Sequence, residues 1–469
     1  MKDIIVCFHM LVTSVACVAQ CGSFSFTTQA EIDQFGIDHP DCTDIGDLFI
    51  EGEDIFDLTP LSNITSGNEM RIRNCPNLVG GIEFNNLDHC GSLTINSNDN
   101  VQHISIPELK TANDGLAFHN NIALQSYEAP KLEYTNLLSI INNRTIQSHN
   151  IDLKALKAVQ SLAVEECENI EDLTFLSGLE EVEFRFELFR NDQLRSLAGL
   201  ENLNYIYTFD IYENISLESL EALENLTSVE LQLTISRCDA LTSLRGLDNI
   251  EWIGKGEYTG FFLLENNNSL LSLDALESFS EVGDLVIRQN IKLKNLDPLS
   301  NLTTVGGILL ITSNIELTDL SGLDNVDVNE LDKLDISNNW ELESCGSKFV
   351  CEYLESGKEV LIENNKFGCR SVEQVTEDCL TSTHPEIVND DSITLFPNPT
   401  SRYLQINGIA ISDITSIAIY DVLGRQVYRS DSTIDFADDI DVSDLGYGSF
   451  IMEVQLVSNR VAYERFVKY

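Results

Sequence analysis

The sequence predicts an all-β chain in which a long repeat solenoid of about thirteen coils precedes a small β-sandwich. Three observations support this prediction. An apolar pattern recurs about every 24 residues, an Asn or Cys recurs at the same place in each repeat, and the C-terminal stretch consists of short alternating segments separated by turns.

The stretch 270–314 holds two copies of one pattern, in which apolar residues three apart lead into a short alternating strand and then an asparagine. The first copy places Leu270, Leu273, Leu276, Phe279, Val282, Leu285, Ile287 and Asn290, and the second places Leu293, Leu296, Leu299, Leu302, Val305, Leu309, Ile311 and Asn314. Such a repeat indicates a solenoid, because one unit buries its apolar edge only against its neighbours. Strands from successive coils are expected to lie parallel, about 4.8 Å apart.

The asparagine of this pattern can be followed along the chain in both directions. Its positions are Cys75, Asn98, Asn121, Asn143, Cys167, Asn191, Asn214, Cys238, Asn267, Asn290, Asn314, Asn339 and Asn365. Stacked side-chain amides can donate and accept along the solenoid axis and so satisfy backbone groups where each coil turns. We therefore interpret Cys75, Cys167 and Cys238 as smaller members of this ladder, and not as zinc ligands.

The composition limits the classes of partner. Lys and Arg number 28 against 76 Asp and Glu, so the formal net charge is −48. This charge would repel a nucleic-acid backbone and anionic membranes, and no nucleic-acid partner or membrane insertion is expected. It could attract calcium, yet no calcium-loop motif occurs and no cofactor is predicted.

Residues 1–19 have the pattern of a secretory signal peptide, with cleavage expected after Ala19. The apolar run that follows Lys2 is too short to span a membrane. Lipoprotein processing before Cys17 or Cys21 is the alternative, but Ser14 and Gln20 fit a lipobox badly.

Export makes disulfides expected among the ten cysteines that remain. Residues 20–44 are predicted to form an N-terminal cap closed by a Cys21–Cys42 bond, which for a loop of this size contributes about 3 kcal/mol. At the other end four cysteines allow three pairings. We expect Cys345–Cys369, because both follow a ladder asparagine closely, and Cys351–Cys379. Cys90 has no evident mate and is expected to be a buried free thiol.

The coils and both ends of residues 21–380 resemble the receptor L-domain family, with the repeat solenoid itself predicted at residues 45–380. The residues that carry the resemblance are the coil pattern "LxSLxGLxNLxxVxxxLxIxxN", the opening "FTTQAEIDQF…HPDC" and the ending "LDISNNWELESC…VCEYL…IENNKFGCRSVEQVTEDC". The resemblance implies a right-handed single-stranded β-helix related to leucine-rich repeats, with a Cys-rich C-terminal cap. It also implies a scaffold that binds through its surface, and it names no ligand.

Residues 381–391 are predicted to be a linker, and residues 392–469 a sandwich of about seven strands. This tail resembles the type A C-terminal sorting domain of the type IX secretion system. The residues that carry the resemblance are Pro397, Asn398, Pro399, Thr400, Tyr420, Asp421, Gly424, Arg425, Leu445, Gly448 and 465–469. Where members of this family usually read "G-x-Y", this chain has Gly446, Tyr447, Gly448, Ser449 and Phe450, so the aromatic residue is displaced. The resemblance implies recognition by the secretion machinery and a secreted or cell-surface location.

One region departs from the regular apolar pattern. Alternation in "EFRFELFRN" predicts Phe184, Phe186 and Leu188 inside and Phe189 outside, and alternation in "YIYTFDIYEN" predicts Tyr207, Phe209 and Ile211 inside and Asp210 and Tyr212 outside. Phe189 and Tyr212 would then occupy equivalent outward positions on adjacent coils. The longest coil adds Trp252, Tyr258 and Phe261 on a Gly-rich insertion. Exposed aromatic rings beside polar groups suit a sugar or protein ligand, although the rings could also cover each other.

The combined features favour an exported, adhesin-like binding scaffold for a glycan or protein ligand. No named catalytic motif occurs, so an enzyme is not expected. Two alternatives remain. One is a structural, acidic surface-layer or matrix component. The other is an enzyme that acts on polysaccharides, which is disfavoured because the outward basic residues Arg73, Arg185 and Arg288 are far apart.

Overall fold

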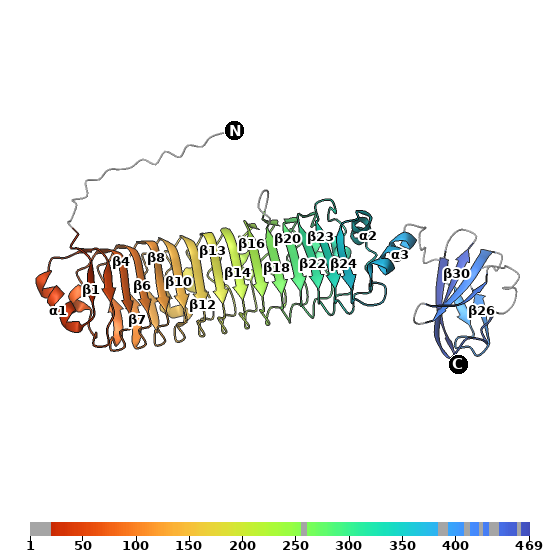
Figure 1. Cartoon of the computed structure of the whole chain (residues 1–469), viewed down its shortest axis with the longest axis horizontal. Helices are drawn as coiled ribbons and strands as arrows, with labels where there is room; N and C mark the ends of the chain where they lie inside the picture. Colours follow the sequence, from red (N-terminus) through yellow and green to blue (C-terminus); the bar gives the residue numbers. More distant parts are fainter. Residues whose placement is uncertain are drawn as a thin grey trace, which may run out of the picture. The chain divides into compact units, whose positions relative to one another are not determined.

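The computed structural model describes residues 20–254, 260–382, 393–407, 413–421, 425–430, 440–456 and 461–469. The predicted signal peptide and almost all of the predicted linker lie outside these ranges. The chain divides into two compact units, Met1–Thr376 and Glu377–Tyr469. Figure 1 shows the elements of both units.

The first unit is built on one long parallel sheet of 16 strands, in which each strand pairs with its counterpart in the next coil (Figure 1). Its main path is β1 (Phe24–Phe26), β3 (Leu48–Ile50), β4 (Ser66–Arg73), β6 (His89–Asn96), β8 (Thr111–His119), β10 (Tyr134–Ile141), β12 (Ala158–Glu165), β13 (Glu181–Phe189), β14 (Tyr205–Tyr212), β16 (Gln232–Ser236), β18 (Phe261–Glu265), β20 (Asp284–Arg288), β22 (Ile308–Thr312), β23 (Lys333–Ser337) and β24 (Glu359–Glu363), with β2 (Asp44–Ile45) beside β4. This arrangement is that of a β-solenoid.

Shorter elements complete the coils. One four-stranded parallel sheet contains β5 (Gly80–Glu83), β7 (Val101–Ser105), β9 (Ser126–Glu128) and β11 (Ile151–Asp152), and another contains β15 (Ser228–Val229), β17 (Trp252–Ile253), β19 (Glu281–Val282) and β21 (Thr304–Val305). Short 3₁₀ turns lie at η1 (Thr59–Leu61), η2 (Ser148–Asn150), η3 (Thr174–Leu176), η4 (Glu221–Leu223), η5 (Asp297–Leu299) and η6 (Ser321–Leu323). The repeated leucines between these elements, such as Leu270, Leu293 and Leu296, are fully buried. Burial of this apolar row against neighbouring coils stabilises the solenoid.

The predicted asparagine ladder is present and buried. The backbone N–H of Asn267 donates to Oδ1 of Asn290 at 3.0 Å, and Asn290 repeats this bond to Asn314 at 3.1 Å. Each amide nitrogen donates back to a strand carbonyl, as Asn290 does to Leu264 at 2.9 Å. Cys167 and Cys238 stand in the same row, and their backbone N–H groups donate to the next asparagine. The ladder interpretation of these cysteines is therefore confirmed.

The all-β prediction is wrong in one respect, because the described residues are mostly β but also form three short α-helices. They are α1 (Gln29–Asp38), α2 (Lys348–Glu355) and α3 (Val372–Ser382). The start of α1 has a capping box in which Thr28 and Glu31 exchange side-chain to backbone hydrogen bonds. The T-x-x-E spacing of Thr28 and Glu31 in the sequence is typical of a helix N-terminus. Helices at the two ends of the sheet cover strand edges that would otherwise be open.

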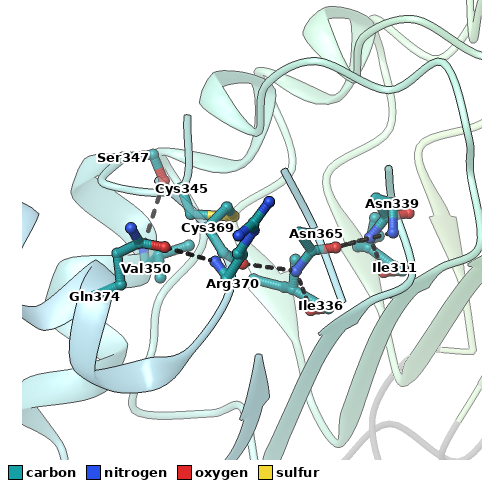
Figure 2. The surroundings of a disulfide bond; sticks show 10 residues. All are labelled: Ile311, Ile336, Asn339, Cys345, Ser347, Val350, Asn365, Cys369, Arg370 and Gln374. Carbon is teal, nitrogen blue, oxygen red and sulfur yellow. Dashed lines mark hydrogen bonds between the residues drawn. A yellow bond between two sulfur atoms is a disulfide. The ribbon is translucent and has the colours of Figure 1, made fainter. Parts of the chain in front are cut away.

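The structure contains the Cys21–Cys42 and Cys345–Cys369 disulfides, with Cα–Cα distances of 5.9 and 5.4 Å. Cys351 and Cys379 are disulfide-bonded as well, and the pairing between them stays a prediction. Cys345–Cys369 lies where the asparagine ladder ends (Figure 2). There Asn365 accepts from the backbone of Asn339 at 2.9 Å and donates to the carbonyls of Ile336 and Cys369.

The second unit contains two antiparallel sheets. One joins β25 (Thr394–Phe396), β26 (Tyr403–Asn407) and β29 (Ile440–Asp441), and the other joins β28 (Gln426–Ser430), β27 (Ile414–Asp421), β30 (Gly448–Leu456) and β31 (Val461–Lys468). Buried residues of both sheets, including Leu404, Ile417 and Met452, form a single core. The short alternating strands expected from the sequence are present in this unit.

Candidate ligand-binding site

Phe189 and Tyr212 lie side by side, as the sequence predicts. They are register partners at the ends of β13 and β14, and both are half-buried. They line a cavity of about 280 Å³ together with Glu187, Glu213, Ser236, Arg237 and Glu265. The guanidinium of Arg190 lies over the ring of Phe189, 4.7 Å from its centroid. The site therefore combines two aromatic rings with carboxylate, hydroxyl and guanidinium groups.

Two of the other predicted aromatics, Trp252 and Phe261, lie in other parts of the solenoid. Phe261 is not on a loop but begins β18, where it pairs with Gln232 and Asp284 in a different row of the long sheet. Trp252 belongs to β17, in the shorter sheet. Tyr258 lies outside the described residues. Of the described residues of the predicted patch, Phe189 and Tyr212 line the aromatic cavity.

The predicted inward positions of Phe184 and Tyr207 are wrong, because Phe184 is exposed and the half-buried Tyr207 stacks on it. Between Val182 and Arg185, β13 holds one residue more than β14, which is a β-bulge. Here Glu183, Phe184 and Arg185 are all exposed between the buried Val182 and Phe186, so Phe184 points outward and is 57% exposed. Asp210 does face the outer side of the sheet, but it is only 1% exposed because neighbouring side chains cover it.

A network of polar side chains around Asp210 holds the hydroxyl of Tyr212. Asp210 accepts hydrogen bonds from Nε of Arg185 at 2.9 Å, from Nε2 of Gln232 at 2.7 Å and from the Tyr212 hydroxyl at 3.3 Å. These three donors satisfy a buried carboxylate that would otherwise be costly. Arg185 also pairs with Glu187, at 3.3 Å. The network links the sheet surface to the wall of the aromatic cavity.

A longer polar groove of about 730 Å³ adjoins the aromatic cavity and shares Glu213, Arg237 and Glu265 with it. Its other lining residues are Arg144, Glu166, Glu168, Arg190, Asp192, Ile215, Asp239, Asn266, Asn268 and Gln289. Glu166, Arg190, Glu213, Arg237, Asn266 and Gln289 each directly precede a ladder residue and have positive φ, between 52° and 58°. This left-handed turn recurs at every coil and points the ladder side chain inward while the preceding side chain faces the groove. The sequence analysis missed these residues, although their place before each ladder member was a usable signal.

Glu213 lies between two arginines in this groove. Its carboxylate accepts from Arg190 and from Arg237, each at 2.6 Å. The hydrogen bond from Arg190, with a further one from Arg237, lowers the pKa of Glu213 below its usual value. The groove therefore presents alternating charges that are partly neutralised by each other.

Buried thiols in the same region take no part in the site. Cys90, Cys167 and Cys238 are free and buried, and burial raises the pKa of each to about 12. Within the described residues no group of three His, Cys, Asp or Glu side chains could hold a metal ion. No helix among the described residues is long and apolar enough to cross a membrane.

The first predicted group of sorting residues, Pro397, Asn398 and Pro399, lies beside the last strand of the second unit, β31. Asn398 donates to the carbonyl of Arg465 at 2.8 Å and accepts from the backbone of Val467 at 3.0 Å. Thr400 donates its backbone N–H to Val467 at 2.8 Å. Pro397 and Pro399 flank Asn398 in this segment.

The second predicted group of sorting residues follows β27. Arg425 donates from Nε to Asp421 at 2.8 Å, and Gly424 lies outside the described residues. The segment around Asn398 is hydrogen-bonded to the last strand, β31, although the two are far apart in the sequence.

Residues 394–468 match a family described as "Secretion system C-terminal sorting domain". The second unit is a type IX secretion sorting domain. The sorting domain directs the chain out of the cell, so the protein is secreted or displayed on the cell surface, and the secretion machinery is a partner. No curated protein matches the chain.

Replacing Asn398 by alanine in the sorting domain is expected to reduce export. The change removes both side-chain bonds to β31, which at about 1 kcal/mol each would loosen the last strand. Immunoblots of culture medium, cell surface and periplasm would measure the exported fraction, with Asn407→Ala on β26 as the matched control. Unchanged export of Asn398→Ala would contradict the proposed role of these bonds.

Proposed function

We propose that the chain is an exported, non-catalytic binding scaffold of the adhesin type, with a glycan as its ligand. In this proposal residues 45–380 form a right-handed β-helix of the receptor L-domain type, and the sorting domain delivers it. The observation that carries the proposal is the pairing of Phe189 and Tyr212 in one cavity lined by Glu187, Ser236 and Arg237.

The chemistry of this cavity suits a sugar. The apolar face of a pyranose ring packs on an aromatic side chain, while its hydroxyls accept and donate at the surrounding polar groups. Asp210 holds the hydroxyl of Tyr212, and a ring held in place loses less entropy when the ligand binds.

The adjoining groove supports a ligand longer than one sugar. It continues from the shared residues Glu213, Arg237 and Glu265 across successive coils. Coils repeat about every 4.8 Å along the sheet, close to the length of one sugar unit. A linear glycan laid along the solenoid could therefore meet equivalent polar residues in each coil.

The double substitution Phe189→Ala with Tyr212→Ala is expected to weaken glycan binding by at least about tenfold, because it removes the central apolar contact. The purified chain would first be screened on a glycan array with and without calcium, and a discrete hit would then be measured by calorimetry. The matched control is Phe184→Ala with Tyr205→Ala, which removes two aromatic rings near the N-terminal ends of the same two strands. Both variants should keep the wild-type melting temperature within a few degrees.

The outcomes separate the candidate functions. Equal binding by Phe189→Ala/Tyr212→Ala and the wild type would refute the site. Absence of any glycan hit together with calcium-dependent self-association would favour the structural surface-layer alternative. Turnover of a polysaccharide would contradict the non-catalytic proposal.

A further inference from the structure

We propose that Phe184, Tyr205 and Tyr207 form a second binding site, which takes an arginine or lysine side chain of a partner protein. The site lies near the N-terminal ends of β13 and β14, whereas the glycan site lies at their C-terminal ends, and the two sites share no residue. It therefore goes beyond the proposed function.

The bulge near the N-terminal end of β13 exposes an aromatic surface. Phe184 is 57% exposed and stacks on Tyr207, with ring centroids 6.1 Å apart and planes 15° apart. Tyr205, which is 36% exposed, is two residues before Tyr207 on the same strand. A stacked pair that remains this exposed leaves one aromatic face open to a ligand.

Carboxylates surround the aromatic rings. Glu181 is the register partner of Tyr205, and Glu183 is next to Phe184 within the bulge. Burial, followed by the negative charges of Glu230, Glu181 and Glu183, raises the pKa of the Tyr205 hydroxyl. Three carboxylates therefore act on one aromatic position, and the local potential favours a cation.

The two arginines nearest to Phe184 in sequence are engaged with other groups. Arg185, the next residue after Phe184, pairs with Asp210 and Glu187. The guanidinium of Arg190 lies over the ring of Phe189 at the C-terminal end of β13. Among the described residues no cation lies over Phe184 or Tyr207. A guanidinium or ammonium from a partner could stack on Phe184 while it pairs with Glu183.

A protein segment fits better than an isolated small cation. Leu137, 38% exposed on β10, lies in the same register row as Arg185, through Ser161 of β12. An aromatic contact with an apolar extension and a charged rim is typical of a protein interface, where arginine is enriched. The net charge of −48 would speed the approach of a basic partner and repel anionic membranes.

The test uses the full chain and two capped peptides of equal shape, acetyl-Leu-Arg-Leu-amide and its citrulline analogue, which lacks the charge. Saturation-transfer NMR and calorimetry at physiological salt would measure binding. We expect the arginine peptide to bind roughly three- to tenfold more tightly than the citrulline peptide, as for a cation over an aromatic ring beside carboxylates. Phe184→Ala and Glu183→Gln should each remove most of this preference.

Controls separate this site from the glycan site and from general attraction to an acidic surface. Phe56→Ala removes an equally exposed ring, 60% exposed, at the N-terminal end of the solenoid and should change nothing. Phe189→Ala/Tyr212→Ala should bind the arginine peptide as the wild type does. Equal binding of both peptides, or a preference that survives Phe184→Ala, would overturn the inference. So would a preference lost equally in Phe56→Ala. None of these results depends on whether a glycan is found.

Discussion

Alanine in place of Asn290 is expected to lower the free energy of unfolding by about 4 kcal/mol, because it leaves two buried backbone groups without partners. The Oδ1 atom of Asn290 accepts from the backbone of Asn267, and its amide nitrogen donates to Leu264, both at full burial. Each unsatisfied buried group costs about 1 to 3 kcal/mol. Urea denaturation followed by circular dichroism would measure the loss.

Two matched variants sharpen this experiment. Asn301 makes the same kind of bond, from its side chain to the carbonyl of Glu277 at 2.7 Å, but on the exposed surface. Asn301→Ala is therefore expected to cost less than about 1 kcal/mol, since water replaces the lost bond. Asn290→Cys should lose less than Asn290→Ala, because Cys238 already occupies this row one coil away from Asn267. Equal stability of Asn290→Ala and Asn301→Ala would refute the structural role of the ladder.

Alanine in place of Arg185 is expected to lower the free energy of unfolding by about 3 kcal/mol, because it removes the one charged partner that Asp210 has among the described residues. Asp210 is 1% exposed, whereas the Arg185 side chain is 45% exposed. The loss should therefore fall at the low end of the range for broken buried ion pairs, about 3 to 5 kcal/mol. Tyr212 should also be held less firmly, so glycan affinity should fall without any change in the aromatic rings themselves.

The double variant Arg185→Met with Asp210→Leu tests whether the charge is the cause. Replacing both partners by apolar residues of similar size is often neutral, so most of the stability lost in Arg185→Ala should return. Glycan affinity should remain low in the double variant, since Asp210→Leu removes the acceptor of the Tyr212 hydroxyl. A double variant as unstable as Arg185→Ala would indicate that packing of the arginine stem, and not the ion pair, is responsible.

Much of the first unit was predictable because its sequence repeats. Any inward position, such as Leu293 or Asn290, has counterparts one coil before and after it, and all of them meet the same environment. The helix α1 was missed although its capping pattern was present, because the periodic pattern was followed only inside the coils. The sorting tail was predictable from local motifs, and the structure adds that Asn398 is bonded to the last strand.

The repeat, the ladder and the adjacency of Phe189 and Tyr212 could be predicted from the sequence, since they follow from counting residues along a nearly regular repeat. The facing of Phe184 and the burial of Asp210 depend on three-dimensional packing. The extra residue in β13 interrupts the alternation of inward and outward side chains, and the burial of a carboxylate depends on which side chains the neighbouring coils place over it. The groove beside the aromatic pair was likewise decided in three dimensions, because its residues are about one coil apart in sequence and meet only when the coils stack.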